Sequence, residues 1–196
     1  MQPTLWGPGL WHILFTCAYT AKKHNFKDLE RLCLVLVPTL LPCQKCRDHF
    51  ETNQRKALRK LSSTTMRTTG DVFKFLYYLK DEVNKSLNQR SIQLSELRER
   101  FAFSGGVVND VLVADTLVIM AIHASANGNE TLFVDFTQLL HVLLPLPHDS
   151  ELGAVLSKFK TPIVYSAYTA CRNTRLEHGH PIPRLDWFHK TVRETS

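Results

Sequence analysis

The sequence predicts an all-α protein. Apolar residues recur three and four positions apart in most segments of the chain, as they do along one face of a helix, and the alternation typical of a β-strand is not convincing anywhere. The pair Gly105-Gly106 interrupts this pattern near the middle of the chain. We therefore predict one helical bundle over residues 1–104 and a second helical bundle over residues 105–196.

Length and composition fit a globular protein with a packed core, because apolar residues make up 44% of the 196 residues. The longest uncharged apolar run, Leu32–Leu41, contains Pro38 and is too short to span a bilayer. Residues Met1–Leu10 lack the basic and apolar segments of a signal peptide. Five cysteines are too few for a secreted scaffold held by disulfides. We therefore expect a soluble cytoplasmic protein with no membrane span.

The net charge of +6 is spread along the chain. Basic residues do not form a long stripe interleaved with aromatic residues, so we expect no nucleic acid partner. The basic cluster between Arg55 and Lys60 is interpreted as a solvated helix face, with an acidic partner as the alternative.

Helical spacing divides the first half into five helices. They are marked by Leu10–Ala18, Leu29–Leu40, a helix that begins at Cys43, Val72–Leu87 and Ser95–Phe103. A polar stretch over residues 62–70 separates the third helix from the fourth.

The dithiol formed by Cys43 and Cys46 is the strongest functional feature. Two thiols three positions apart at the start of a helix are close enough to form one disulfide, and Pro42 favours a helix that begins at Cys43. The helix N-terminus and the positive charges of Lys45 and Arg47 lower thiol pKa values. We therefore expect a reactive redox pair.

Other readings of the cysteines and histidines are weaker. A structural zinc site needs four ligands, and the chain has no second closely spaced pair; a thioredoxin-like fold needs strands. Cys17 and Cys33 lie on apolar helix faces and are predicted to be core residues, whereas the role of Cys171 stays open. The histidines at 178, 180 and 189 are more typical of an exposed polar loop than of a metal site, so we predict no metal.

The second half repeats the first in degenerate form. Leu132–Leu146 resembles the second helix and also ends in a Leu-Pro pair, but His148 and Glu151 stand where the two cysteines would be. Farther on, Arg172–Leu176 echoes Val83–Leu87. We interpret the second half as a copy that has lost its active site, although two unrelated small helical bundles can also align this well.

Three motifs occur in a recognisable order. They are Trp6-Gly7-Pro8-Gly9-Leu10-Trp11, Leu41-Pro42-Cys43-Gln44-Lys45-Cys46 and Val83-Asn84-Lys85-Ser86-Leu87. With these motifs, residues 5–101 resemble the Erv/ALR family of FAD-linked sulfhydryl oxidases. The likeness is greatest to the compact members carried by large DNA viruses. The second half would then be a pseudo-Erv bundle without the dithiol.

The resemblance implies a helical bundle that holds the isoalloxazine ring of FAD against the dithiol. The chain has no G-x-G-x-x-G motif, which agrees with a site that is not a Rossmann fold. By analogy with the family, Cys46 is the flavin-proximal thiol and Cys43 exchanges with substrate, so both are catalytic. The residues matched to the cofactor site are Gly7, Trp11, Phe15, Cys46, His49, Lys80, Val83, Asn84, Lys85 and Leu87.

Two of these positions depart from the family pattern. Phe15 stands where many members have a histidine, and it cannot donate a hydrogen bond. The family segment His-Asn-x-Val-Asn reads Lys80-Asp81-Glu82-Val83-Asn84 here, so the imidazole that stacks on the adenine is lost. Lys80 could instead reach a phosphate or lie over the adenine.

The function implied is an FAD-dependent thiol oxidase that forms disulfides in protein substrates and passes the electrons to oxygen, giving hydrogen peroxide. Its substrate would be a protein dithiol or a small redox carrier protein, and in a virus the disulfides would serve virion assembly in the host cytoplasm. We expect the two halves to form an intramolecular pseudo-dimer, with whole-chain homodimers still open. The alternative is a non-catalytic helical scaffold that uses the same fold.

Overall fold

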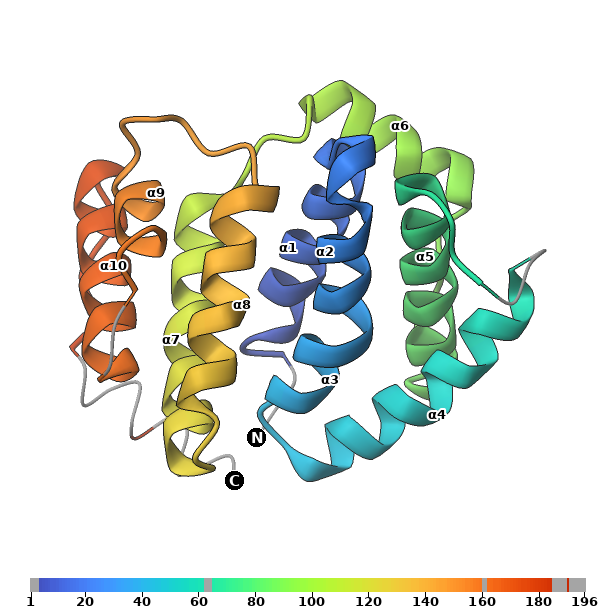
Figure 1. Cartoon of the computed structure of the whole chain (residues 1–196), viewed down its shortest axis with the longest axis horizontal. Helices are drawn as coiled ribbons and strands as arrows, with labels where there is room; N and C mark the ends of the chain where they lie inside the picture. Colours follow the sequence, from blue (N-terminus) through green and yellow to red (C-terminus); the bar gives the residue numbers. More distant parts are fainter. Residues whose placement is uncertain (1–3, 62–64, 160–161, 185–189, 191–196) are drawn as a thin grey trace.

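The computed structural model describes residues 4–61, 65–159, 162–184 and 190, and within them every regular element is a helix (Figure 1). The prediction of an all-α protein is confirmed. The helices of the first half are α1 (Gly7–Thr20), η1 (Lys23–Asn25), α2 (Phe26–Arg31), η2 (Leu32–Leu36), α3 (Val37–Leu40), α4 (Gln44–Lys60), α5 (Thr69–Ser86) and α6 (Leu94–Ser104). Those of the second half are α7 (Asp110–Ala126), α8 (Glu130–Leu143), α9 (Glu151–Leu156) and α10 (Ile163–Glu177).

The helix ends follow local sequence signals. Helix α1 has a proline in its first turn, where the missing N–H costs nothing. Helix α5 begins with a capping box, in which the Thr68 side chain accepts from the Asp71 amide and the Asp71 carboxylate accepts from the Thr68 amide. Helix α6 stops at Gly105 because its left-handed backbone, with φ of 62°, ends the helical pattern.

The helix predicted over Leu29–Leu40 is interrupted. It consists of α2, a π-helical segment (η2) and α3 in succession. Pro38 has no N–H to donate to the carbonyl four residues earlier, so regular α-helical bonding cannot continue unbroken through this stretch. The segment ends at Leu41, and Pro42 alone separates it from Cys43.

The two halves share one hydrophobic core. Figure 1 shows α7 and α8 between the α1–α3 group and the α9–α10 pair, with α5 and α4 on the far side of α1. Apolar residues of both halves belong to a single buried cluster. Helix α7 lies at its centre and packs on α10, α1, α8 and α3. The division into two domains stays a prediction, since residues before and after the connection at 104–110 belong to the same core.

Polar contacts also join the halves. The Arg31 guanidinium pairs with the Asp135 carboxylate at 2.7 Å. The backbone N–H of Asn109 donates to Nε2 of His12 at 2.9 Å, immediately before α7 begins. Among the described residues, none of the helices combines the length and the apolar character needed to cross a bilayer.

Candidate active site

Cys43 and Cys46 form a disulfide at the start of α4, with 5.2 Å between their Cα atoms. Cys43 is the N-cap residue of α4, and its Sγ accepts a hydrogen bond from the Cys46 amide at 3.1 Å. An amide and a helix N-terminus directed at a sulfur both stabilise a thiolate there. The local structure therefore favours the thiolate of Cys43 once the disulfide is reduced.

Arg47 fixes the turn that leads into this helix. Its guanidinium donates to the carbonyl of Leu41 at 2.6 Å and to the side-chain oxygen of Gln44 at 2.9 Å. The side chain therefore ties the end of α3 to the first turn of α4 and adds positive charge beside the disulfide.

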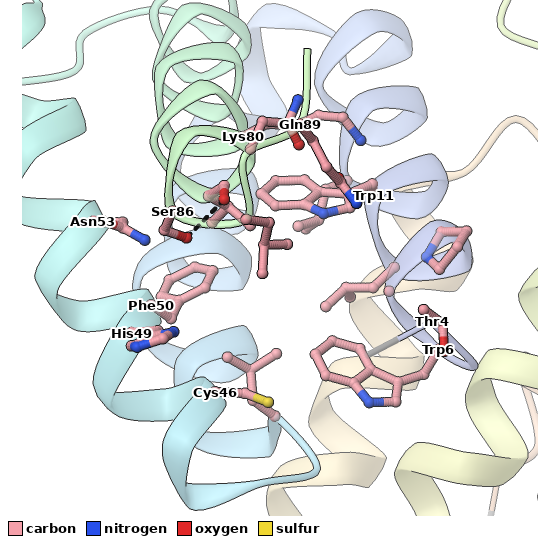
Figure 2. A pocket seen from close by; sticks show the side chains of 18 residues that line it. Thr4, Trp6, Trp11, Cys46, His49, Phe50, Asn53, Lys80, Ser86 and Gln89 are labelled. Atoms are coloured by element: carbon pink, nitrogen blue, oxygen red, sulfur yellow. Dashed lines mark hydrogen bonds between the residues drawn. The ribbon is translucent and has the colours of Figure 1, made fainter. Parts of the chain in front are cut away.

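A cavity of about 310 Å³ lies beside the disulfide, between α1, α4 and α5 (Figure 2). Its volume is at the lower end of the range found for small-molecule sites. Cys46 lines the cavity and Cys43 does not. The lining residues are Thr4, Trp6, Gly7, Pro8, Leu10, Trp11, Leu14, Leu41, Cys46, His49, Phe50, Asn53, Lys80, Val83, Asn84, Ser86, Leu87 and Gln89. The two sulfur atoms of one bond thus have different surroundings.

Most of the residues matched to a cofactor site meet at this cavity. Those that line it are Gly7, Trp11, Cys46, His49, Lys80, Val83, Asn84 and Leu87. They come from three helices and from the cap of α5, so the chain fold brings together positions up to 80 residues apart.

Phe15 and Lys85 do not line the cavity, which departs from the sequence prediction. Phe15 is 2% exposed and lies in an aromatic cluster, with ring centroids 5.4 Å from Phe73 and 5.9 Å from Phe101. Its ring packs behind Trp11, 6.0 Å away, because these distant helices close over it. The exposed Lys85 ammonium instead pairs with Asp81 at 2.6 Å, along the same helix.

Lys80 lies within the cavity wall. Its Nζ is 5.0 Å from the centroid of the Trp11 ring, a cation–π distance. Burial lowers the pKa of Lys80, since a desolvated ammonium is costly.

The carboxylates that follow Lys80 in sequence belong to a separate ionic cluster. Asp81 and Glu82 both pair with Lys60, on α4, and with Lys85. Lys56 reaches Glu82 as well, at 3.9 Å. The basic face of α4 is therefore exposed, as predicted, but part of it also links α4 to α5.

Several lining residues were not anticipated. Phe50 and Asn53 are both buried and follow Cys46 at helical spacing, a signal that could have identified them. Trp6 is 5% exposed, and its indole N–H has no hydrogen-bond partner in the described part of the chain. Trp6 belongs to the first motif, but sequence alone did not distinguish it from a core tryptophan.

The remaining cysteines are buried thiols. Cys17 and Cys33 are core residues, as predicted, and burial raises the pKa of both. Cys171 is also buried, and its Sγ donates to Oδ1 of Asp115 at 3.1 Å. Burial raises the pKa of Cys171 to about 12, so this thiol is protonated at neutral pH. The Asp115 carboxylate also accepts a bidentate pair of hydrogen bonds from the Arg175 guanidinium, which holds the carboxylate in place.

Among the described residues, no group of three or more His, Cys, Asp or Glu side chains is placed to hold a metal ion. His178 lies 3.8 Å from an Asp110 carboxylate oxygen, whereas His189 is outside the residues that the structure describes.

Comparison with known proteins identifies the first half. The model of the Erv1 / Alr family matches residues 8–102, a span that contains the dithiol and nearly the whole cavity wall. Searches of curated proteins and of solved structures each returned no match. Members of the family are generally FAD-linked sulfhydryl oxidases. Residues 8–102 of this chain are therefore an Erv1 / Alr family domain, with the Cys43–Cys46 disulfide at its cavity.

Proposed function

We propose that the protein is an FAD-dependent thiol oxidase that forms disulfides in protein substrates. The observation that carries this proposal is the position of the disulfide: Cys46 lines the cavity, while Cys43 lies outside the cavity wall. Such a bond can receive electrons on one side and deliver them on the other.

Two exchange steps oxidise the substrate. A substrate thiolate attacks Sγ of Cys43, the bond to Cys46 breaks and Cys46 leaves as a thiolate. The second substrate thiolate then attacks the mixed disulfide at the substrate sulfur, which forms the substrate disulfide and releases Cys43 as a thiolate. The substrate loses two electrons and two protons, and the Cys43/Cys46 pair holds the electrons. The amide of Cys46 and the start of α4 stabilise the Cys43 leaving group.

FAD, when bound, supplies the two-electron acceptor for the reduced pair and the reaction with oxygen that yields hydrogen peroxide. The donor set of the cavity fits this group. Trp6, Trp11 and Phe50 offer flat apolar surface, and Lys80 offers positive charge. Cys46 would lie beside the isoalloxazine, since it is the sulfur of the disulfide that lines the cavity.

We further propose that residues 107–196 are a degenerate second copy. The succession α7, α8, α9, α10 parallels α1, α2–α3, α4, α5, with α9 much shorter than α4. At the position that corresponds to Cys46, the Glu151 carboxylate accepts a hydrogen bond from the Asn173 amide at 3.3 Å. This contact joins α9 directly to α10. The copy would then act as the internal partner of a pseudo-dimer, with one FAD bound per chain.

The resemblance stated for the sequence also supports a proposal for substrate and location. We infer a protein dithiol or a small redox carrier protein as substrate, since Cys43 is partly exposed at the start of α4 and lies outside the cavity. The likeness to members carried by large DNA viruses supports disulfide formation in virion proteins within the host cytoplasm.

A non-catalytic scaffold is the second candidate. The replacement of the family's His-Asn pair by Lys80-Asp81 favours it, because Asp81 is committed to ion pairs. Purifying the full chain separates the two candidates. An oxidase carries a yellow chromophore that releases FAD on denaturation, and it consumes oxygen when a reduced protein dithiol is added. A colourless protein that consumes no oxygen after incubation with FAD would exclude the oxidase and support the non-catalytic scaffold.

A further inference from the structure

Lys80 is unusual among the residues of the cavity wall. The wall contains no carboxylate, and Cys46 is held in the disulfide. The ionisable side chains among the lining residues are therefore Lys80 and the exposed His49. The ammonium therefore determines the electrostatic character of a largely apolar cavity.

This ammonium has no anionic partner within the described part of the chain. Its sequence neighbours Asp81 and Glu82 are engaged by Lys60 and Lys85, outside the cavity. A partly desolvated cation without a counter-charge is unfavourable, as the lowered pKa of Lys80 reflects. A ligand that brings negative charge into the cavity would remove this cost.

The contact with Trp11 decides which part of a dinucleotide Lys80 can meet. A base stacked between the ammonium and the indole would hold these two groups roughly 7 Å apart, which is twice the usual contact distance of about 3.5 Å. The ammonium is already 5.0 Å from the ring centroid, so it covers this face of Trp11. An adenine therefore cannot stack between Lys80 and this face of Trp11, so Lys80 does not replace the family's imidazole there.

Figure 2 shows Lys80 and Trp11 at one end of the cavity and Cys46 at the other. If the reactive ring lies against Cys46, the remainder of an extended cofactor runs toward Lys80. We propose that Lys80, held against Trp11, is the counter-ion for the diphosphate of the bound dinucleotide. The proposal rests on the FAD-dependent function given above and adds to it the group that Lys80 recognises.

The test measures FAD affinity of the apo-protein by fluorescence titration. Lys80→Met removes the charge and keeps the length of the side chain, whereas Lys80→Arg keeps the charge. Lys74→Met removes a charge from the same helix outside the cavity and is the matched control. We expect Lys80→Met to weaken FAD binding about tenfold or more and to reduce its dependence on salt. Lys80→Arg and the control should stay within about threefold of the wild type.

Competition against FAD separates the diphosphate from the adenine. ADP should compete better than adenosine with the wild type, and this advantage should disappear in Lys80→Met. If ADP and adenosine lose affinity equally in Lys80→Met, Lys80 contacts the adenine, and the proposal is overturned. If Lys80→Met does not fold, the wild-type comparison decides: equal competition by ADP and adenosine at low salt overturns it.

Different results would overturn the proposed function and the role of Lys80. Wild-type protein that binds no FAD would remove the proposed function and this inference together. Wild-type protein that binds FAD, with Lys80→Met binding equally well at every salt concentration, would overturn the role of Lys80 alone.

Discussion

Gly9 of α1 lies directly against Thr116 of α7. A Cβ built on Gly9 would overlap the Thr116 hydroxyl and would lie 2.9 Å from the carbonyl oxygen of Leu112. The absence of a side chain at this position therefore lets the first helix of each half approach the other closely. The contact accounts for the glycine in the middle of the first motif by packing rather than by cofactor binding.

Gly9→Ala should destabilise the protein by about 1 to 3 kcal/mol, because the backbone of α7 cannot retreat without disturbing the core. Gly7→Ala is the matched control, since a Cβ there meets nothing within 4 Å. The free energy of unfolding in urea measures both. Equal stabilities for the two variants would contradict the close packing of α1 on α7.

Cys43→Ser and Cys46→Ser should each abolish oxidation of a protein dithiol while leaving the fold intact, since both residues lie at a partly accessible helix start. The variants should differ in their spectra with bound flavin. Cys43→Ser keeps the thiol that faces the cavity and should give a long-wavelength charge-transfer band, whereas Cys46→Ser should not. Bands of equal strength would mean that the two roles are wrongly assigned.

Trp11→Ala and His49→Ala should lower the amount of FAD bound per purified chain, because both side chains line the cavity. His49 is exposed, so its replacement should change stability by less than about 0.5 kcal/mol. Phe15→Ala should instead cost about 3 to 5 kcal/mol, because Phe15 is buried in the aromatic cluster. Full FAD occupancy in both cavity variants would place the cofactor elsewhere.

The contact between His12 and Asn109 should make stability depend on pH. His12 must be neutral to accept the Asn109 N–H, and burial lowers its pKa below the usual 6.5. The unfolded chain therefore binds this proton more readily. The contribution is complete above pH 6.5 and declines as the pH falls from there toward the lowered pKa of the folded state. The difference in unfolding free energy between wild type and His12→Gln, measured from pH 8 to pH 5, should narrow accordingly; a constant difference would argue against it.

Truncation after Phe103 should give an insoluble or self-associating protein. It would expose the surfaces of α1 to α3 that pack on α7 and α8. Light scattering coupled to gel filtration measures the outcome. A truncated chain that stays monomeric, soluble and active would rule out the second half as an internal partner.

Helices α4, α5 and α8 could be predicted because each keeps one polar face. Helix α7 could not, because it is buried on nearly every side and residues 116–122 are all buried in succession. Such a helix has no period to detect. The π-helical segment was also missed, since nothing in an apolar run reveals how its hydrogen bonds shift around a proline.

The candidate site divides in the same way. Cys46 and His49 could be predicted because helical spacing is local information. Phe15 could not be excluded, because only the packing of Phe73 and Phe101 from distant helices shows that its ring lies behind Trp11. Lys85 differs, because its pairing with Asp81 one turn earlier on the same helix is local information that the sequence already contains.

The orientation of the disulfide has a consequence for how this protein can change. Of the two sulfurs, only that of Cys46 meets the cavity, whereas Cys43 lies outside it, next in sequence to the exposed Gln44 and Lys45. We therefore expect substrate binding at Cys43 and ligand binding in the cavity to depend on separate sets of residues. On the proposed function, substitutions near Cys43 could change which substrates are oxidised without weakening cofactor binding, and substitutions in the cavity could do the reverse.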